Sequence, residues 1–265
     1  MRWWRDITEA GHAPMPLRAI IWDVDGTLAE TERDGHLPAF NAAFEAAGVP
    51  WRWSTGRYGE LLGVTGGYER LLHDMAVQPE APRTPAEREA LARRLHLDKN
   101  ARYAQIVAQG RIPLREGVRE LMDDCRRNGV VMAIATTTSR SNVEALLGAH
   151  LGAAWREHFA CVLCGEDAPR KKPDPLVYTL ALEHLRLGAR EVLAIEDSPV
   201  GVRACVGAGV PVVVSRSVYF ADASHPDALA VGPSLGQRAG WSREARPPVR
   251  GRIDLDVLRA WIGAS

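Results

Sequence analysis

Residues 20–27 are Ile20-Ile21-Trp22-Asp23-Val24-Asp25-Gly26-Thr27, an apolar run followed at once by two acids one residue apart. The run predicts a buried strand, and in extended backbone residues i and i+2 point to the same side. Asp23 and Asp25 would therefore project into one small volume, and Gly26 would allow a sharp turn after them. Two carboxylates repel by about 4 kcal/mol at ~4 Å if the effective dielectric constant is ~20. Two interpretations fit this segment alone: an acidic turn after a strand, or a site for a divalent cation.

The composition is typical of an ordinary soluble globular protein, and we expect a cytoplasmic one. Of 265 residues, 46% are hydrophobic and 25% are charged, and Lys plus Arg equals Asp plus Glu at 33 each. This balance argues against nucleic acid or an acidic membrane as a partner, and no run approaches the ~20 apolar residues of a membrane span. Residues 1–16 form an N-terminal extension without the apolar segment of a secretory signal. Cys161 and Cys164 have metal-like spacing but no second pair, so a buried strand is the preferred interpretation.

An all-α unit is predicted to follow the first strand. Helical spacing of apolar residues runs from Glu30 to a stop at Gly48, and further helical patterns lie near residues 58–62, 71–75 and 85–109. No β-branched run interrupts residues 64–106. We expect this helical insertion to span residues 33–112, with residues 17–32 and 113–265 forming one core domain.

The rest of the core alternates between helix and strand. Helices are expected over residues 115–128, 139–147, 175–187, 199–208 and 254–262, and strands over residues 130–135, 159–163, 192–195 and 211–214. This alternation predicts an α/β fold with a parallel sheet covered by helices on both faces. Residues 216–252 lack a strong period and are expected to be a loop with at most one short helix.

Polar residues follow several of the predicted strands directly. Asp23 and Asp25 follow the first strand, Thr136 the second, and Glu196-Asp197 a later one, while Lys172 lies in a loop that leads to a helix. The carboxyl ends of strands in an open parallel sheet line one crevice, so these residues are expected to converge. Taken singly, Lys172 also fits a solvated lysine, Thr136 a turn residue, and Glu196-Asp197 an acid pair that starts a helix.

The converging residue types suit phosphoryl transfer. One carboxylate can attack phosphorus, and a neighbouring acid can protonate the leaving alkoxide and then activate water. We expect the pKa of that second acid to be raised by the first carboxylate. Hard oxygen ligands favour Mg2+, and Lys172 with Thr136 could stabilise the phosphoryl oxygens.

The sequence resembles the haloacid dehalogenase-like hydrolase superfamily over about residues 18–214. Residues 23–27 match its first motif, Thr136 its second, Lys172 its third, and Glu196-Asp197 its fourth. The resemblance implies a Rossmann-like core with an inserted helical cap, Asp23 as nucleophile and Asp25 as general acid/base. It also implies Mg2+ held by the Asp23 carboxylate, the Asp25 carbonyl and Asp197, with Glu196 nearby.

The helical insertion is similar to the small cap of the β-phosphoglucomutase-like branch, and most similar to the CbbY-like group. The shared residues are Glu30-Thr31-Glu32, Thr65-Gly66-Gly67 followed by Glu69-Arg70, and residues 135–139 (ATTTS) with Asn142. This likeness implies a sugar-bisphosphate phosphatase, with xylulose 1,5-bisphosphate, a by-product inhibitor of Rubisco, as the characteristic substrate. The position after the two glycines is usually basic in this group and is Tyr68 here.

Candidate substrate-binding residues come from both halves of the chain. Arg70, or Lys99 with His96 at i and i+3, could hold a non-reacting phosphate in place of Tyr68, and Glu32 and His36 could reach a sugar hydroxyl. The complete set is Glu32, His36, Gly66, Gly67, Tyr68, Arg70, His96, Lys99, Thr137, Thr138, Ser139 and Asn142. The alternatives are a solvated helix surface for the cap residues and a helix-dipole role for Glu32.

We expect a monomeric, Mg2+-dependent phosphatase that acts on a small phosphorylated sugar through an aspartyl-phosphate intermediate. A phosphomutase would use the same catalytic residues, and a phosphosugar-binding protein without activity is the third interpretation. Dehalogenation is disfavoured, because halide leaves unprotonated and the second acid would have no use.

Overall fold

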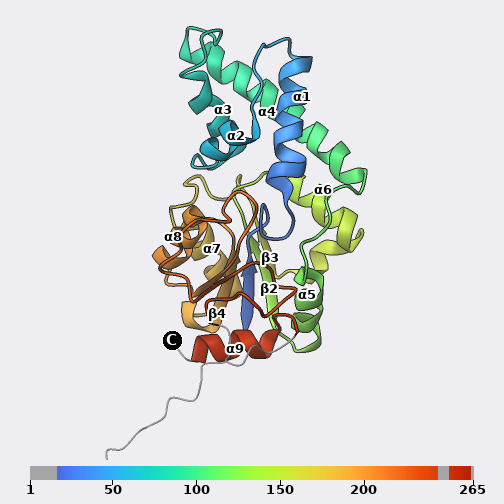
Figure 1. The fold of residues 1–265 in the computed structure, drawn as a ribbon, viewed down its shortest axis with the longest axis vertical. Coiled ribbons are helices and arrows are strands. Elements are labelled where there is room, and N and C mark those ends of the chain that lie inside the picture. The colour runs from blue at the N-terminus through green and yellow to red at the C-terminus, as the bar shows by residue number, and fades with distance from the viewer. Residues whose placement is uncertain (1–16, 244–250, 264–265) are drawn as a thin grey trace, which may run out of the picture.

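The computed structural model describes residues 17–243 and 251–263, and its centre is a six-stranded sheet (Figure 1). The strand order is β3-β2-β1-β4-β5-β6, and every neighbouring pair is parallel. The strands are Ala19–Trp22 (β1), Val131–Ala135 (β2), Cys161–Leu163 (β3), Val192–Glu196 (β4), Val212–Ser215 (β5) and Ala230–Gly232 (β6). The acidic residues that follow β1 therefore lie at the middle of the sheet, between the ends of β2 and β4.

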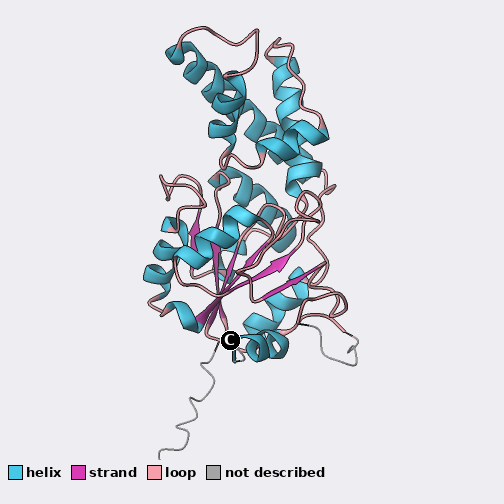
Figure 2. Ribbon diagram, turned by 60° about the vertical axis from the view of Figure 1, so that its left-hand side comes forward, coloured by secondary structure: helices cyan, strands magenta, loops and turns pink. Residues whose placement is uncertain are grey.

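Helices cover both faces of the sheet (Figure 2). Ile20 and Trp22 of β1 pack in one hydrophobic cluster with α5, α6 and α9, whereas Ala19 and Ile21 pack in another with α7 and α8. Burial on both faces explains why β1 is continuously apolar. The covering helices are Val118–Arg127 (α5), Arg140–Leu151 (α6), Leu176–Leu185 (α7), Pro199–Gly207 (α8) and Leu255–Gly263 (α9), with 3-10 turns at Trp155–His158 and Ala189–Glu191. The predicted α/β architecture is confirmed.

An all-α insertion, the cap, lies above the carboxyl ends of the strands (Figure 1). Its helices are Leu37–Ala46 (α1), Thr55–Leu61 (α2), Gly67–Met75 (α3) and Pro85–Ala108 (α4). The cap has its own aromatic cluster, in which the Phe40 ring lies 4.7 Å from that of Trp53. Thr84 and Glu87 form a capping box at the start of α4, which satisfies two backbone donors there. The domain limits at residues 33 and 112 remain a prediction.

The helix predicted from Glu30 to Gly48 has a different beginning in the structure. A five-residue π-helical turn, Glu32–His36, precedes α1. Gly35 is buried in this turn, and a Cβ there would lie 2.7 Å from both Tyr103 and Ile112. The π turn adds a residue to the helical repeat, a feature that apolar periodicity does not reveal and that often occurs at functional sites.

The expectation for residues 216–252 was wrong in one respect. The described part of this segment contains no helix but supplies the sixth strand, β6. Gly232 at its end packs under Trp241, where a Cβ would lie 2.1 Å from the indole ring. Three residues that end in glycine are too few to carry a period-two pattern. The predicted extension at residues 1–16 lies outside the described residues.

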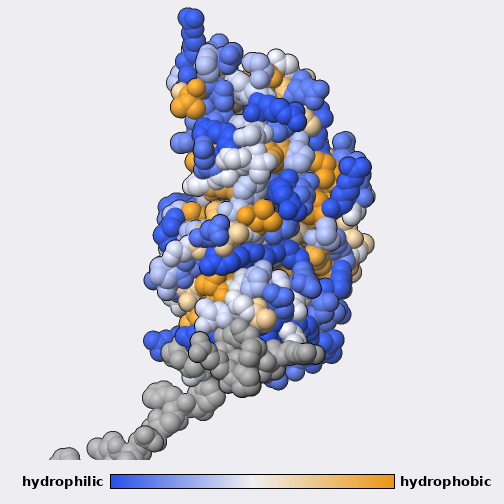
Figure 3. Space-filling model, in the orientation of Figure 1, coloured by the Kyte–Doolittle hydropathy of each residue, from blue (hydrophilic) through white to orange (hydrophobic). Residues whose placement is uncertain are grey.

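On the face shown in Figure 3, hydrophobic side chains are scattered among polar ones. Within the described part of the chain, no helix has the length and apolar character needed to cross a membrane. The four cysteines are buried free thiols.

Gly117, which precedes α5, lies in close contact with the backbone of a distant segment. It has φ of +83°, and a Cβ would lie 2.3 Å from the backbone carbon of Leu235. Gly110 has φ of +68° with nothing within 4 Å of the added atom. Gly110→Ala should lower the free energy of unfolding by about 1–2 kcal/mol, the left-handed penalty alone, and Gly117→Ala by about 3 kcal/mol. Urea unfolding measures both, and equal losses would contradict the close approach.

Candidate functional site

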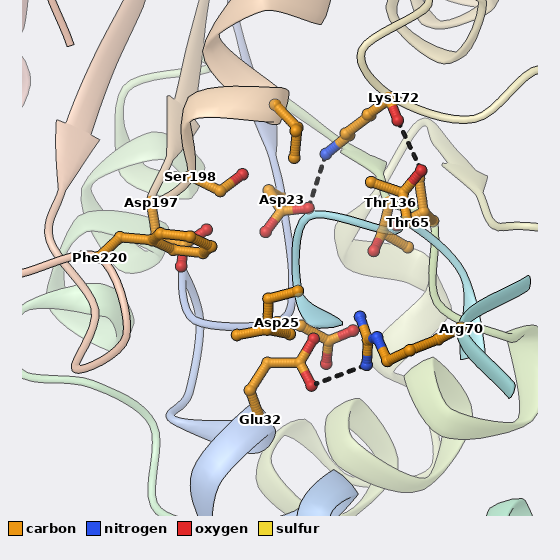
Figure 4. A pocket seen from close by; sticks show the side chains of 13 residues that line it. Asp23, Asp25, Glu32, Thr65, Arg70, Thr136, Lys172, Asp197, Ser198 and Phe220 are labelled. Atoms are coloured by element: carbon orange, nitrogen blue, oxygen red, sulfur yellow. Dashed lines mark hydrogen bonds and ion pairs between the residues drawn. The ribbon is translucent and has the colours of Figure 1, made fainter. Parts of the chain in front are cut away.

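One pocket lies at the carboxyl ends of the strands, beneath the cap (Figure 4). Core and cap both supply its walls, and its volume is about 50 Å³. The lining residues are Asp23, Asp25, Glu32, Leu62, Thr65, Arg70, Thr136, Thr137, Lys172, Asp197, Ser198, Val200 and Phe220. The structure thus brings together the strand-end residues Asp23, Asp25, Thr136 and Asp197 with Lys172.

Lys172 is buried between two carboxylates. Its ammonium donates hydrogen bonds to Asp23 Oδ1 at 2.7 Å, Glu196 Oε1 at 2.6 Å and the Ala135 carbonyl at 3.0 Å. Tyr178 donates a further hydrogen bond to Glu196 Oε1, at 2.6 Å. All three ammonium donors therefore have acceptors, from residues that follow or belong to β1, β2 and β4. With a side-chain exposure of 3%, Lys172 is no solvated lysine.

The charges in this cluster do not balance. Burial would lower the pKa of Lys172, but the charges of Asp23 and Glu196 raise it above its ordinary value. Burial and the charge of Glu196 raise the pKa of Asp23 to about 7, although Lys172 opposes the shift. Burial together with Asp23 and Glu196 also raises the pKa of Asp197 well above its ordinary value. Three carboxylates around one ammonium favour a bound cation.

Asp23, Glu196 and Asp197 can each present an oxygen within 4.8 Å of the others. This all-carboxylate set fits a hard cation such as Mg2+ better than a soft metal. Gly26 keeps the space beside it free, since a Cβ there would lie 2.1 Å from Asp197 Oδ2. Glu196 already accepts hydrogen bonds from Lys172 and Tyr178, so its main contacts orient the lysine. Asp23 and Asp197 line the pocket and are the better placed ligands.

Asp25 is held by two neighbours from the segment that follows it. Thr31 donates a hydrogen bond to Asp25 Oδ1 at 2.6 Å, and His36 Nε2 lies 2.9 Å from the same oxygen. The His36 ring stacks on Tyr103 with a centroid separation of 4.2 Å. The π turn therefore directs His36 to the carboxylate of Asp25, where the sequence predicted a contact with substrate.

The predicted raised pKa of Asp25 is wrong for this state of the protein. Burial does raise it, but the charge and hydrogen bond of His36 and the hydrogen bond of Thr31 outweigh burial and hold the pKa below its ordinary value. Repulsion from Asp23 is therefore not the dominant influence on Asp25, because His36 and Thr31 both contact its Oδ1.

On the cap side, a buried network surrounds Arg70. Its Nη1 donates to the Tyr58 hydroxyl at 2.7 Å. The same nitrogen lies 3.7 Å from Glu32 Oε2, an ion pair shown in Figure 4. Tyr58 in turn donates a short hydrogen bond to Glu32. Glu32 and Arg70 both line the pocket, whereas Tyr58 was not predicted because its spacing fits an ordinary cap-core residue. Arg70 is buried, so a solvated helix surface does not describe it.

The residues after β2 divide into two groups. Thr136 and Thr137 line the pocket, while Ser139 and Asn142 contact Asn100 of the cap and Thr138 contacts Asn142. Asn142 Nδ2 donates to Thr138 Oγ1 at 3.1 Å and to Asn100 Oδ1 at 3.2 Å, and Asn100 Nδ2 donates to Ser139 Oγ at 3.2 Å. Of these candidate substrate residues, Ser139 and Asn142 therefore tie the start of α6 to helix α4 of the cap.

Besides His36, five cap candidates lie outside the pocket lining: Gly66, Gly67, Tyr68, His96 and Lys99. Gly66 precedes α3 with φ of +95°, and the first residue of that helix, Gly67, packs against His96. Tyr68 lies beneath Arg93 at 5.8 Å. Burial and the charge of Lys99 lower the pKa of His96 to about 4.

Lys99 is a buried cation over two aromatic rings. Its Nζ lies 5.0 Å from the ring centre of Phe40 and 5.5 Å from that of Tyr103. Burial lowers its pKa to about 8. Its hydrogen bond is to the amide oxygen of Asn100 at 3.2 Å, and among the described residues no carboxylate lies within ion-pair distance of it.

Five pocket residues were not among the predicted site residues, although Thr65 belongs to a shared motif: Leu62, Thr65, Ser198, Val200 and Phe220. Thr65 donates a hydrogen bond to the Lys172 carbonyl at 2.6 Å and so joins cap to core. Ser198 caps α8 through Gly201 N at 3.1 Å, which its place after Glu196-Asp197 could have indicated. Phe220 lies in the segment without periodicity and gave no signal.

Comparisons with known proteins agree with this geometry. A family model described as haloacid dehalogenase-like hydrolase matches residues 17–209. The plasmid CbbY protein of Cupriavidus necator is 44% identical over 247 residues, which cover 92% of this chain and 96% of that protein. The crystal structure of CbbY from Rhodobacter sphaeroides with phosphate matches with a TM-score of 0.77 and 39% identity, covering 82% of this chain and 94% of that one. A mutant of that protein in complex with xylulose 1,5-bisphosphate gives the same values.

The carboxylate cluster generates a prediction that needs no enzyme assay. Asp197→Asn should weaken Mg2+ binding at least ~10-fold, because it removes one of two charged ligands that face the pocket. Asp123→Asn removes an acid on the exposed side of α5 and should leave binding unchanged. Titration calorimetry of both variants with Mg2+ measures the effect, and equal affinity in the two would contradict the site.

Proposed function

Because this chain belongs to the haloacid dehalogenase-like hydrolase family, we infer that its pocket is the active site of a phosphatase that hydrolyses a phosphorylated sugar. The observation that carries this proposal is the contact of the Asp23 carboxylate with buried Lys172 at the rim of the sheet. A carboxylate held in this way has one oxygen fixed by the ammonium and the other free to react. The pocket's acids, hydroxyls and cations match the needs of phosphoryl transfer.

Asp23 is the proposed nucleophile. Its free oxygen would attack phosphorus and form an aspartyl phosphate as the bond to the sugar oxygen breaks. Lys172 and Thr136 would stabilise the phosphoryl oxygens, and Glu196 keeps Lys172 in position at 2.6 Å. Mg2+, held by Asp23, the Asp25 carbonyl and Asp197, would neutralise charge on the phosphoryl group.

Asp25 is the proposed general acid and base. In the first step it gives its proton to the leaving alkoxide, and in the second it takes a proton from the water that attacks the aspartyl phosphate. This step releases inorganic phosphate and free Asp23. A phosphate dianion beside Asp25 would raise its pKa toward the protonated form, while the hydrogen bonds from Thr31 and His36 keep the carboxyl oriented.

Xylulose 1,5-bisphosphate is the proposed substrate. The support is the likeness to CbbY of Rhodobacter sphaeroides, of which a mutant is known in complex with this compound. A bisphosphate needs a second cationic contact away from Asp23. Lys99 is suited to this role, because it is buried near the acids of the site and has only an amide oxygen as a hydrogen-bond partner.

The cap must move for substrate to enter. The pocket volume of about 50 Å³ is small for a sugar bisphosphate, since small-molecule sites typically measure roughly 300–1,000 Å³. The hydrogen bonds of Thr65 to the Lys172 carbonyl and of Asn100 to Ser139 would break on opening. Closure over bound substrate would then exclude bulk water while the aspartyl phosphate forms.

The nucleophile assignment has a direct test. Asp23→Asn should lower phosphate release from sugar phosphates by ~10³-fold or more, because an amide cannot form the acyl phosphate. Asp25→Asn should be nearly as damaging. Inorganic phosphate assays with circular dichroism of each variant measure this. Turnover near that of the wild type in folded Asp23→Asn would eliminate the covalent mechanism, and formation of an isomer in place of inorganic phosphate would indicate a mutase.

The bisphosphate assignment predicts a selective effect on binding. Lys99→Met should raise KM for xylulose 1,5-bisphosphate about 10-fold, since it removes one charge-assisted contact, with a smaller effect on a sugar monophosphate. Arg102→Met, a partly exposed cation on the same helix paired with Asp98, is the matched control. Equal KM changes for mono- and bisphosphate in Lys99→Met would refute the proposed contact.

A further inference from the structure

The segment that follows β5 leaves the sheet and reaches the cap. Tyr219 and Phe220 pack against the cap's hydrophobic cluster, whose other members among the described residues all come from residues 37–95. The Tyr219 ring meets that of Tyr58 edge to face at 5.8 Å. A Cβ on the neighbouring Gly59 would lie 3.2 Å from the Tyr219 ring. This segment is thus a contact of the core with α2 on one side of the pocket.

Two arginines fix the shape of this segment. Arg115 donates hydrogen bonds to the carbonyls of Ser215, at 2.9 Å, and Arg216. Arg216 donates to the carbonyls of Ala221 and Ala223, both at 2.7 Å. Guanidinium groups bound to successive carbonyls hold an irregular backbone in one conformation. The aromatic pair is therefore presented on a rigid support.

Phe220 also faces the pocket itself (Figure 4). Most of the lining is charged or hydroxylic, and its apolar members are Leu62 from the cap, Val200 from α8, and Phe220. Phosphate and hydroxyl groups have polar partners in this pocket, whereas the carbon chain of a sugar does not. Phe220 is the largest apolar side chain in the lining and can pack against such a chain.

We propose that Phe220 is a specificity-determining residue of this phosphatase, whose ring packs against the carbon skeleton of the bound sugar phosphate. Tyr219 docks on Tyr58 and holds the segment against the closed cap. The inference rests on the proposed function, and it means that a residue of the core domain contacts the substrate in addition to residues of the cap. Phe220 takes no part in proton or phosphoryl transfer, so its loss acts on binding of substrates with a long carbon chain.

The test compares two variants on two substrates. Phe220→Ala should raise KM for xylulose 1,5-bisphosphate about fivefold, equivalent to about 1 kcal/mol. Its kcat/KM for acetyl phosphate, which has only two carbons, should stay within about twofold of the wild type. Val218→Ala is the matched control, because Val218 is 47% exposed and contacts Glu30 through its backbone amide. Both kinetic constants of this control should equal those of the wild type.

Phe220→Leu keeps apolar surface and should restore most of the affinity lost in Phe220→Ala. An unchanged KM in Phe220→Ala, or an equal loss on both substrates, would overturn the assignment while leaving the phosphatase in place. A wild-type protein that hydrolyses neither substrate would instead overturn the proposed function itself.

Discussion

The ammonium of Lys172 is the constraint on which the rest of the site depends. It is buried with Asp23 and Glu196, and removal of one member of such a group leaves an uncompensated charge in a low-dielectric interior. Its partners follow or belong to three neighbouring strands, so the cluster forms only if β1, β2 and β4 lie side by side in register. The same cluster leaves a surplus of carboxylates facing the pocket. The ion pairs that hold the strand ends together thus also set the charge of the pocket.

Much of the core could be predicted from the sequence, because its signals are local. Apolar runs followed by polar residues mark the ends of β1, β2 and β4, and parallel topology brings such ends to one edge of a sheet. For this reason the pattern of strands predicted that Asp23, Thr136 and Asp197 converge, and all three line the pocket. Strand β6 did not, since three residues ending at Gly232 depend on Trp241 for their packing.

The cap was harder to anticipate, because the partners of its residues come from distant segments. Arg70 faces the pocket, whereas Tyr68 and His96 pack elsewhere in the cap, and helical spacing alone does not separate these cases. The pKa of Asp25 depends on His36, which a regular helix would have directed away. Phe220 reaches the pocket from a segment whose backbone carbonyls are bound by Arg115 and Arg216. Each of these features is tertiary in origin.

The number of residues in the π turn Glu32–His36 is itself a determinant of this active site. The two ends of this turn serve different groups, Glu32 in the Tyr58 and Arg70 network and His36 on Asp25. Deleting a single residue here would leave a standard α-helix. The residues before the deletion would then be rotated about the helix axis by about 100° relative to the residues after it. Evolution could then exchange side chains in this turn far more readily than it could shorten it.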